Sequence, residues 1–368
     1  ARLLLNKGAV VDRAPKNGWT PLIVACQKGH VETVRLVLEK GAEVNRATKY
    51  GYTPLFNACE KGHIDAARLL LENGAEVDRA NKDGETPLYA ACWGGHVDAA
   101  RLLLDNGAAV DRTVEKGKWK GATPLLVACY EGHVDAARLC LDRGADINLA
   151  ADDGWTPLFA ACRKGHVDAA RLLLDRGAEV DRATKDGWTP LMVVCQTGQV
   201  EAVRLLLENG AEVDRAAEDG WTPLLIACQN GHVDAARLLL DNGAEVDRAT
   251  ERGQTPLFIA CEEGHVDAAR LLLDKGAEVD RANKRGRTPL DIAKREDHDA
   301  VVALLEEHLD SKFPLHAAAR TGDVEAMTQL LDGGAAVDKV ALFVTCEHGH
   351  VDVARLLLER GAEVDRGK

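Results

Sequence analysis

A Thr-Pro-Leu tripeptide returns at a fixed interval along this chain, and that interval constrains the fold more than any other feature. Its threonines are Thr20, Thr53, Thr86, Thr123, Thr156, Thr189, Thr222, Thr255 and Thr288. Seven of the eight intervals are 33 residues, and the interval from Thr86 to Thr123 is 37. A period of this length is typical of a stacked array in which each repeat packs against its neighbours. We therefore interpret nearly the whole chain as one kind of repeat.

Residues 154–183 predict the structure of one repeat. Thr156 is a favourable N-cap, and Pro157 suits the first helical position because its missing N–H has no partner there. The short helix that follows has a face of small side chains and ends at Gly165. A second, amphipathic helix covers residues 166–174, and the chain then turns back through a projecting hairpin. The sequence therefore predicts an all-α solenoid with short projecting β-hairpins.

These motifs resemble those of the ankyrin repeat. The matching elements are G-x-T-P-L-x-x-A, G-H-V-D-A-A-R-L-L-L and G-A-E-V-D, in nine near-complete copies. The family usually has histidine after Thr-Pro-Leu, and an apolar residue takes that slot here: Ile23, Phe56, Tyr89, Leu126, Phe159, Met192, Leu225 and Phe258. We expect this side chain to pack where the family has a His–Thr hydrogen bond. Phe or Tyr at the slot is similar to ankyrin repeats of protists and algae.

The array has three irregularities. Four extra residues enlarge the hairpin between Arg112 and Thr123, which gives it a basic tip with Trp119. The repeat at 287–310 is unusually polar, as a capping repeat would be. We expect an ankyrin array over 1–310, with a partial first repeat because the chain opens inside a helix at residues 1–5. Further repeats then fill 311–368, either as a second array or as a continuation with loop residues missing.

The charge of the chain bears on its partners. The formal net charge is −13, and the acidic excess is spread along the repeats. Nucleic acid is not an expected partner, because phosphate binding needs a basic face. No apolar run approaches the roughly 18 residues of a membrane-spanning helix, so membrane insertion is not expected either. The oligomeric state is left open.

The cysteines indicate the compartment. Eight of the ten stand five residues after the repeated proline: Cys26, Cys59, Cys92, Cys129, Cys162, Cys195, Cys228 and Cys261. Equivalent positions in stacked helices lie about 8–10 Å apart, whereas a disulfide needs Cα atoms within about 7 Å. Cys346 matches them by alignment, and we expect all nine to be small, buried, free thiols in an intracellular, cytoplasmic location.

The sequence offers no catalytic or metal-binding constellation. Ser311 is the single serine, and the chain has no phosphate-binding loop and no dinucleotide fingerprint. Cys-x-x-x-His recurs, for example at Cys26 and His30, but the next such pair lies about 10 Å away, too far to complete a zinc site. We expect the recurring histidines (His96, His133, His166 and His265) to be structural. The prediction is a non-enzyme without cofactor or metal.

The candidate binding residues lie at the hairpin tips and at the ends of the first helices, which line the concave face of ankyrin proteins. Three tips read Asp-Gly-Trp, and an aromatic face beside a carboxylate suits a lysine or arginine side chain within about 6 Å of the ring. The alternative is that each tryptophan packs across to the next hairpin and stiffens the row. The candidates are Trp155, Trp188, Trp221, Asp153, Asp186, Asp219, Trp93, Tyr130, Trp19 and Tyr52.

The resemblance implies a non-catalytic protein–protein interaction scaffold. We expect the centre of its groove, including Phe159 and Met192, to hold an extended or helical segment of a protein partner, with basic side chains as one option. One alternative is a rigid spacer in a larger assembly, and another is the substrate-recruiting arm of a larger enzyme. A methyl-lysine cage, which some ankyrin domains form, would use Trp188 and Trp221 with the aspartates before them.

Overall fold

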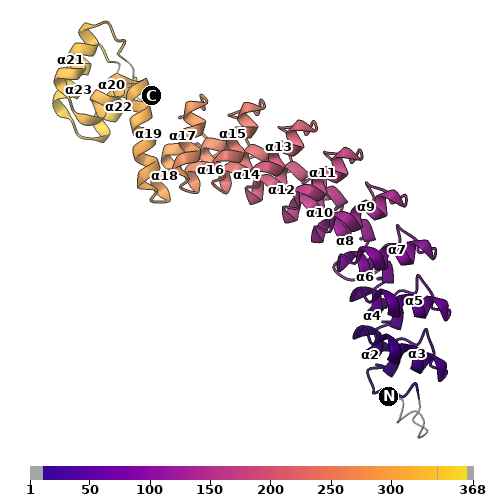
Figure 1. The fold of residues 1–368 in the computed structure, drawn as a ribbon. Coiled ribbons are helices and arrows are strands. Elements are labelled where there is room, and N and C mark those ends of the chain that lie inside the picture. Colours follow the sequence, from indigo (N-terminus) through magenta and orange to yellow (C-terminus); the bar gives the residue numbers. More distant parts are fainter. Residues whose placement is uncertain (1–10, 338, 363–368) are drawn as a thin grey trace. The chain divides into compact units, whose positions relative to one another are not determined.

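The computed structural model describes residues 11–337 and 339–362. The chain divides into two compact units, residues 1–218 and 219–368, and each is built from helix pairs (Figure 1). The partial first repeat expected at residues 1–5 lies outside the described residues. The array boundary expected at residue 310 stays a prediction.

In unit 1 the first helix of each pair begins at the Thr-Pro step. The Thr156 hydroxyl accepts a hydrogen bond from the Phe159 backbone N–H at 3.1 Å, and Thr156 is itself buried. This satisfies one of the free N–H groups at the helix start. The first helices are α2 (Pro21–Gln27), α4 (Pro54–Glu60), α6 (Pro87–Trp93), α8 (Pro124–Glu131), α10 (Pro157–Lys164) and α12 (Pro190–Thr197). Each packs against the next first helix, so they form one row of the unit (Figure 1).

The second helices form a parallel row behind the first. An alanine pair such as Ala169 and Ala170 is fully buried, and it lets neighbouring backbones approach closely. An acidic residue in the first turn, Asp168 in this repeat, complements the helix dipole. The second helices of unit 1 are α3 (Val31–Glu39), α5 (Ile64–Glu72), α7 (Val97–Asp105), α9 (Val134–Asp142), α11 (Val167–Asp175) and α13 (Val200–Glu208).

Six of the histidines that precede second helices bond to the repeat before their own. The His96 Nε2–H donates to the Glu60 carbonyl oxygen at 3.1 Å. The ring of His96 lies against Gly62, where an added Cβ would be 2.5 Å from Nδ1. Gly62 also has φ +70°, so both the backbone and the space require glycine. The same bond to the preceding repeat is made by His63, His133, His265, His298 and His350. The structural role expected for the histidines is thereby confirmed where this bond forms.

The projecting hairpins are tight turns, and no described residue of the chain is assigned to a β-strand. The turn before α12 closes with Thr184 N–H donating to Trp188 O at 2.9 Å and Gly187 N–H donating to Thr184 O at 3.0 Å. Neighbouring turns are joined by a backbone bond, as from Lys185 N–H to Asp153 O at 3.1 Å. The tips of unit 1 therefore form a hydrogen-bonded edge.

Unit 2 continues with the same helix pairs and then departs from them. Its first helices are α14 (Pro223–Gln229), α16 (Pro256–Glu262), α18 (Pro289–Arg295), α20 (Pro314–Thr321) and α22 (Lys339–Glu347). Its second helices are α15 (Val233–Asp241), α17 (Val266–Asp274), α19 (Asp299–Lys312), α21 (Val324–Asp332) and α23 (Val351–Glu359). Helix α19 has 14 residues, and α20 packs against it. Arg320 of α20 forms ion pairs with Glu306 and Asp310 of α19.

The last four helices of unit 2 share a small core of their own: Leu315, Ala318, Ala319, Met327, Leu331, Ala341, Val353 and Leu357. In the polar repeat before them, Asp291 is exposed and its carboxylate accepts from the Thr288 N–H at 2.9 Å. The aspartate therefore stabilises the start of α18 at a position where the other repeats bury an apolar side chain.

The ten cysteines are free thiols, and nine of them are buried. Cys346 is exposed, which corrects the expectation that it is buried like the cysteines with which it aligns. Burial raises the pKa of Cys26 to about 12. The Cys92 Sγ on α6 lies 3.6 Å from the Cys140 Sγ on α9. Cys140 stands where most other second helices have leucine, so this contact does not run between equivalent repeat positions. Within the described ranges, no helix is long and apolar enough to cross a lipid bilayer.

Candidate functional site

An unbroken series of ring contacts crosses the tips and first helices of unit 1. From Tyr89 the ring centroids follow at 6.2 Å to Trp93, 5.5 Å to Trp119 and 4.6 Å to Tyr130. The series continues at 6.3 Å to Trp155 and 5.2 Å to Phe159. These separations are those of favourable aromatic pairs. We call the set Tyr89, Trp93, Trp119, Tyr130, Trp155 and Phe159 the aromatic row.

Trp119 links the two halves of the aromatic row, and it comes from the four-residue insertion. The inserted hairpin is closed by Val114 N–H donating to Ala122 O at 3.0 Å and Ala122 N–H donating to Trp119 O at 2.8 Å. It is joined to the preceding turn by Glu115 N–H, which donates to Asp83 O at 2.8 Å. Where other repeats have their tip residue, this one has the small Ala122, and the insertion supplies the indole in its place.

Two lysines of the chain already lie over rings of the aromatic row. The Lys164 Nζ is 4.7 Å from the Tyr130 ring centroid, and the Lys118 Nζ is 5.4 Å from that of Trp119. Both distances are within the range of cation–π attraction. The exposed faces of the row can therefore hold ammonium or guanidinium groups.

The structure brings three of the predicted site residues together and separates others. Trp93, Tyr130 and Trp155 all belong to the aromatic row, connected through Trp119. Trp188 is half-buried, and no described ring of unit 1 contacts it. Trp221 belongs to unit 2, where it lines a hollow of about 290 Å³ that also includes Asp219.

Two of the predicted aspartates hold the turns. The Asp153 carboxylate accepts a hydrogen bond from the Trp155 N–H at 3.0 Å, and that of Asp219 accepts from the Trp221 N–H at 3.4 Å. Asp186 is exposed, and in its turn the tryptophan N–H donates to Thr184 Oγ1 at 3.2 Å instead. These short-range bonds set the direction of the tips.

The two apolar residues expected at the centre of the groove lie beneath its surface, which corrects that expectation. Met192 is 0% exposed and Phe159 is 4% exposed. Both occupy the slot after Thr-Pro-Leu, which is buried in every repeat from Ile23 to Phe258 and packs as an apolar residue, as expected. The slot therefore supports the binding surface from below, and the buried Phe159 ring contacts that of Trp155.

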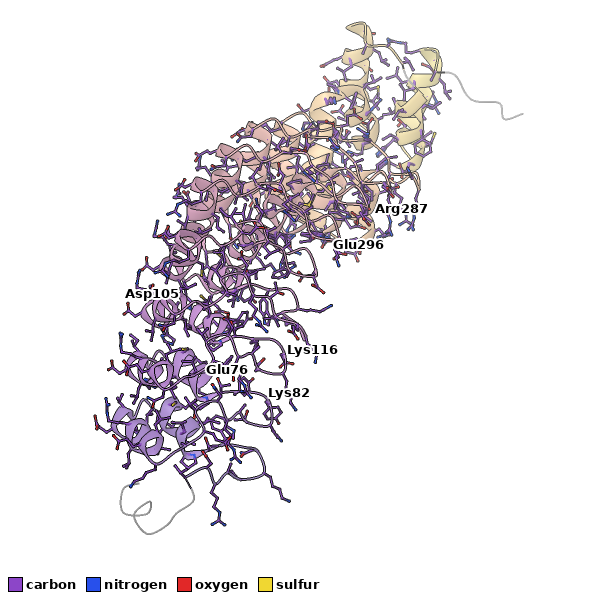
Figure 2. All side chains as sticks on the ribbon, turned by 90° about the vertical axis from the view of Figure 1, so that its right-hand side faces the viewer. Glu76, Lys82, Asp105, Lys116, Arg287 and Glu296 are labelled. Atoms are coloured by element: carbon purple, nitrogen blue, oxygen red, sulfur yellow. The ribbon has the colours of Figure 1, made fainter. Side chains whose placement is uncertain are left out.

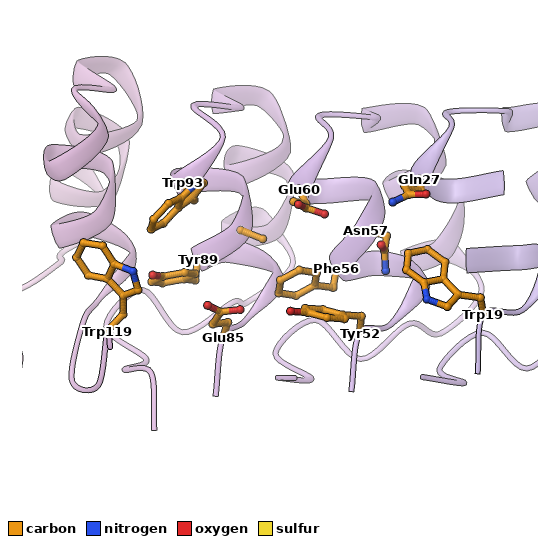
Figure 3. Close-up of a pocket in the computed structure, with 11 residues that line it drawn as sticks. Trp19, Gln27, Tyr52, Phe56, Asn57, Glu60, Glu85, Tyr89, Trp93 and Trp119 are labelled. Carbon is orange, nitrogen blue, oxygen red and sulfur yellow. The ribbon is translucent and has the colours of Figure 1, made fainter. Parts of the chain in front are cut away.

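Trp19 and Tyr52 line a cavity of about 380 Å³ at the end of the aromatic row that begins with Tyr89 (Figure 3). Its remaining lining residues are Gln27, Phe56, Asn57, Glu60, Glu85, Tyr89, Ala90, Trp93 and Trp119. We call it the aromatic–acidic cavity. Sequence reasoning named only three of these residues as candidates; the available signal was that Asn57 and Glu85 are polar where other repeats are mostly apolar or aromatic.

Carboxylates give the aromatic–acidic cavity a negative charge. Burial raises the pKa of Glu85, and the nearby Asp83 and Glu60 carboxylates raise it further, against a hydrogen bond from Asn81 that lowers it. That bond runs from Asn81 Nδ2 to Glu85 Oε2 at 2.6 Å. Lys82 and Lys116, at the tips of their turns, project from one side of unit 1, and Asp105 at the end of α7 lies on the opposite side (Figure 2).

No group of three or more His, Cys, Asp or Glu side chains in the described ranges is arranged to hold a metal ion. The site thus consists of aromatic faces, carboxylates and amides on a hydrogen-bonded edge. These groups can bind another molecule through stacking, cation–π attraction and hydrogen bonds.

Comparison with known proteins agrees with the repeat structure. A family model described as "Ankyrin repeats (3 copies)" matches residues 1–48, 45–114, 110–184, 177–250, 246–312 and 294–368. Among solved structures, the human ASB11 ankyrin repeat domain is 30% identical with a TM-score of 0.54, over 60% of this chain and 98% of that one. No curated protein matches. Ankyrin repeats are generally protein–protein interaction modules and typically non-catalytic. The predicted all-α solenoid is confirmed, and the chain belongs to the ankyrin repeat family.

Proposed function

We propose that this chain is a non-catalytic scaffold that binds an extended segment of a protein partner on the tips and first helices of unit 1. The observation that carries the proposal is the aromatic row: Trp93, Trp119, Tyr130 and Trp155 make successive ring contacts and all remain partly exposed. Partly exposed tryptophan and tyrosine are the residue types that dominate protein-binding surfaces.

The spacing of the repeats favours an extended segment. Packed helices lie about 8–10 Å apart, and an extended chain advances about 3.3 Å per residue, so roughly three partner residues pass each repeat. Basic side chains in such a segment suit the rings of the row, because Lys164 and Lys118 already take comparable positions. Trp188 in unit 1, and Trp221 with Asp219 in unit 2, are proposed as additional contacts.

Photo-crosslinking from two exposed arginines of one repeat tests the proposal. Benzoylphenylalanine replaces Arg163, which is on α10 near the aromatic row, or Arg171, which is on α11 behind it. In a lysate of the source cells, the probe at position 163 should crosslink a protein that the probe at 171 does not. The double variant Trp119→Ala, Trp155→Ala should abolish that crosslink. It should also weaken binding of the partner segment once that segment has been purified.

The opposite pattern would favour the spacer. Crosslinks from position 171 that are insensitive to the tryptophan variants would place the contacts on the second helices. A recruiting arm for a larger enzyme would instead give a crosslinked partner that the catalytic part of that enzyme modifies.

A further inference from the structure

The aromatic–acidic cavity contains polar residues at positions where the repeat is otherwise apolar. Asn57 is 3% exposed, and its Nδ2 donates to the Thr53 backbone oxygen at 2.9 Å. The same slot in the other repeats holds Val24, Ala90, Val127, Ala160, Val193, Ile226, Ile259 and Ile292. Glu85 likewise takes the tip slot, which is aromatic in both preceding repeats. These departures gather on one cavity, so they are not scattered variation.

Tyr89 has a buried hydroxyl without a partner on the wall of this cavity. The side chain is 3% exposed, and its Oη has no hydrogen-bond partner in the described structure. Buried polar groups of native proteins are almost always paired. Burial raises the pKa of Tyr89, with further increases from Glu85 and Glu131, so the hydroxyl stays protonated. Figure 3 shows Tyr89 between Trp119 and Phe56, with Glu85 beside it. A ligand that reaches this wall would satisfy the hydroxyl.

The carboxylates of the cavity favour binding of a cation. Glu85 is hydrogen-bonded to the neutral amide of Asn81 and forms no ion pair with any described residue. Glu60 contributes a second carboxylate; its Oε1 lies 3.2 Å from the exposed Lys61 Nζ. Two carboxylates close to aromatic rings, in a chain of net charge −13, complement a positive group that also has a flat or apolar surface.

We propose that the aromatic–acidic cavity binds the guanidinium group of an arginine in the partner segment. Trp93 and Trp119 both line the cavity with their ring planes at 79° to each other, and a planar cation can stack on an indole face there. Its N–H groups then donate to Glu85, Glu60 and the Tyr89 Oη. Arginine fits better than lysine because guanidinium stacks on rings, is weakly hydrated and has five donors for these acceptors. The inference rests on the proposed function and names the residue that the surface recognises.

Fluorine NMR of the full chain with 5-fluorotryptophan tests this inference directly. The probe is n-butylguanidinium, with n-butylammonium as the lysine analogue and n-butylurea as the neutral isostere. Single Trp→Phe variants assign the six tryptophan signals. The signals of Trp93 and Trp119 should shift with n-butylguanidinium, shift less with n-butylammonium and stay in place with n-butylurea. Trp188, which is outside the cavity, should not respond to any of the three.

Two isosteric variants and one matched control identify the groups responsible. Glu85→Gln removes the charge and retains an acceptor for Asn81, and Tyr89→Phe removes only the hydroxyl. Each should weaken n-butylguanidinium binding roughly tenfold, the usual loss for a charge-assisted hydrogen bond. Glu72→Gln, an exposed glutamate on α5, should leave the affinity unchanged. An unshifted Trp188 signal and unchanged circular dichroism confirm that each variant is folded.

Three outcomes would overturn the inference: no shift at Trp93 and Trp119, an equal shift with n-butylurea, or an equal affinity for n-butylammonium. The crosslinking experiment separates this result from the proposed function. If position 163 crosslinks a partner but the chain does not bind n-butylguanidinium, the proposed partner surface stands and the proposed recognition of an arginine is refuted. Guanidinium binding without crosslinks would retain the cation site and refute the partner-segment surface.

Discussion

Replacing Gly84 by alanine tests how the inserted hairpin is held in position. Gly84 has φ +90°, and an added Cβ would lie 2.4 Å from the Glu115 backbone nitrogen. At the same place the Glu115 and Lys116 N–H groups both donate to the Asp83 oxygen, at 2.8 and 3.0 Å. The alanine therefore cannot be accommodated unless the inserted hairpin moves away, and Trp119 moves with it.

The expected destabilisation has two parts. A left-handed backbone costs a non-glycine residue about 1–2 kcal/mol. Loss of the two hydrogen bonds to Asp83 adds about 1 kcal/mol each. Gly74→Ala is the matched control, because Gly74 has φ +85° but nothing lies within 4 Å of its added Cβ. Gly84→Ala should thus destabilise the inserted hairpin by about 2 kcal/mol more than the control destabilises its own turn.

Hydrogen exchange followed by mass spectrometry measures the destabilisation of the inserted hairpin itself. A local measurement is needed because repeat arrays need not unfold in a single step. The peptide covering residues 113–120 should exchange about thirtyfold faster in Gly84→Ala, as expected for about 2 kcal/mol. In Gly74→Ala the same peptide should exchange at the wild-type rate. Equal protection of this peptide in the two variants would refute the argument that the turn contact holds the insertion.

Four further predictions follow from the described contacts. Trp119→Ala should weaken partner binding about tenfold or more, measured by titration calorimetry, and Trp188→Ala should weaken it less because Trp188 lies outside the aromatic row. In native protein at pH 8, a thiol reagent should label Cys346 quickly and the nine buried cysteines only after unfolding in urea; rapid labelling of more than one would contradict their burial. Unfolded thiols ionise near pH 8.5, whereas the folded pKa of Cys26 is about 12, so the free energy of unfolding should fall as pH rises from about 9 towards 12 in urea titrations, and a cysteine-to-alanine variant at this position should reduce that fall. His133→Leu should lower stability by about 0.5–1.5 kcal/mol, since it removes the bond to the preceding repeat; an unchanged urea midpoint would show that the bond contributes nothing.

The fold was predictable because its signals are local and repeated. In the nine repeats with Thr-Pro-Leu, the threonine starts the first helix through a bond that spans three residues, as at Thr156, and in that repeat Gly165 ends the helix. The same residues recur at one period, so the structure predicted for a single repeat applied to nearly all of the repeats. The strand character of the projecting hairpins stays a prediction, since such short turns contain few residues for strand pairing.

The candidate site was only partly predictable. Trp93, Tyr130 and Trp155 were identified from their slots, but their slots did not reveal that Trp119 connects them. The aromatic–acidic cavity was also missed, because its walls come from four successive repeats. Met192 was placed on the surface from its sequence position, although the close packing of the first helices buries it completely.

The sequence by itself determined the helices, the turns, the stacking of the repeats and the burial of the eight cysteines that follow the repeated proline, since each depends on residues a few positions apart or on the period. Only the tertiary structure decided where the insertion lies, which rings touch and which polar groups face one cavity. These features depend on contacts such as that of Gly84 with Glu115, between residues of different repeats. A local pattern carries no information about them, because the energy of such a contact arises only when the repeats pack together.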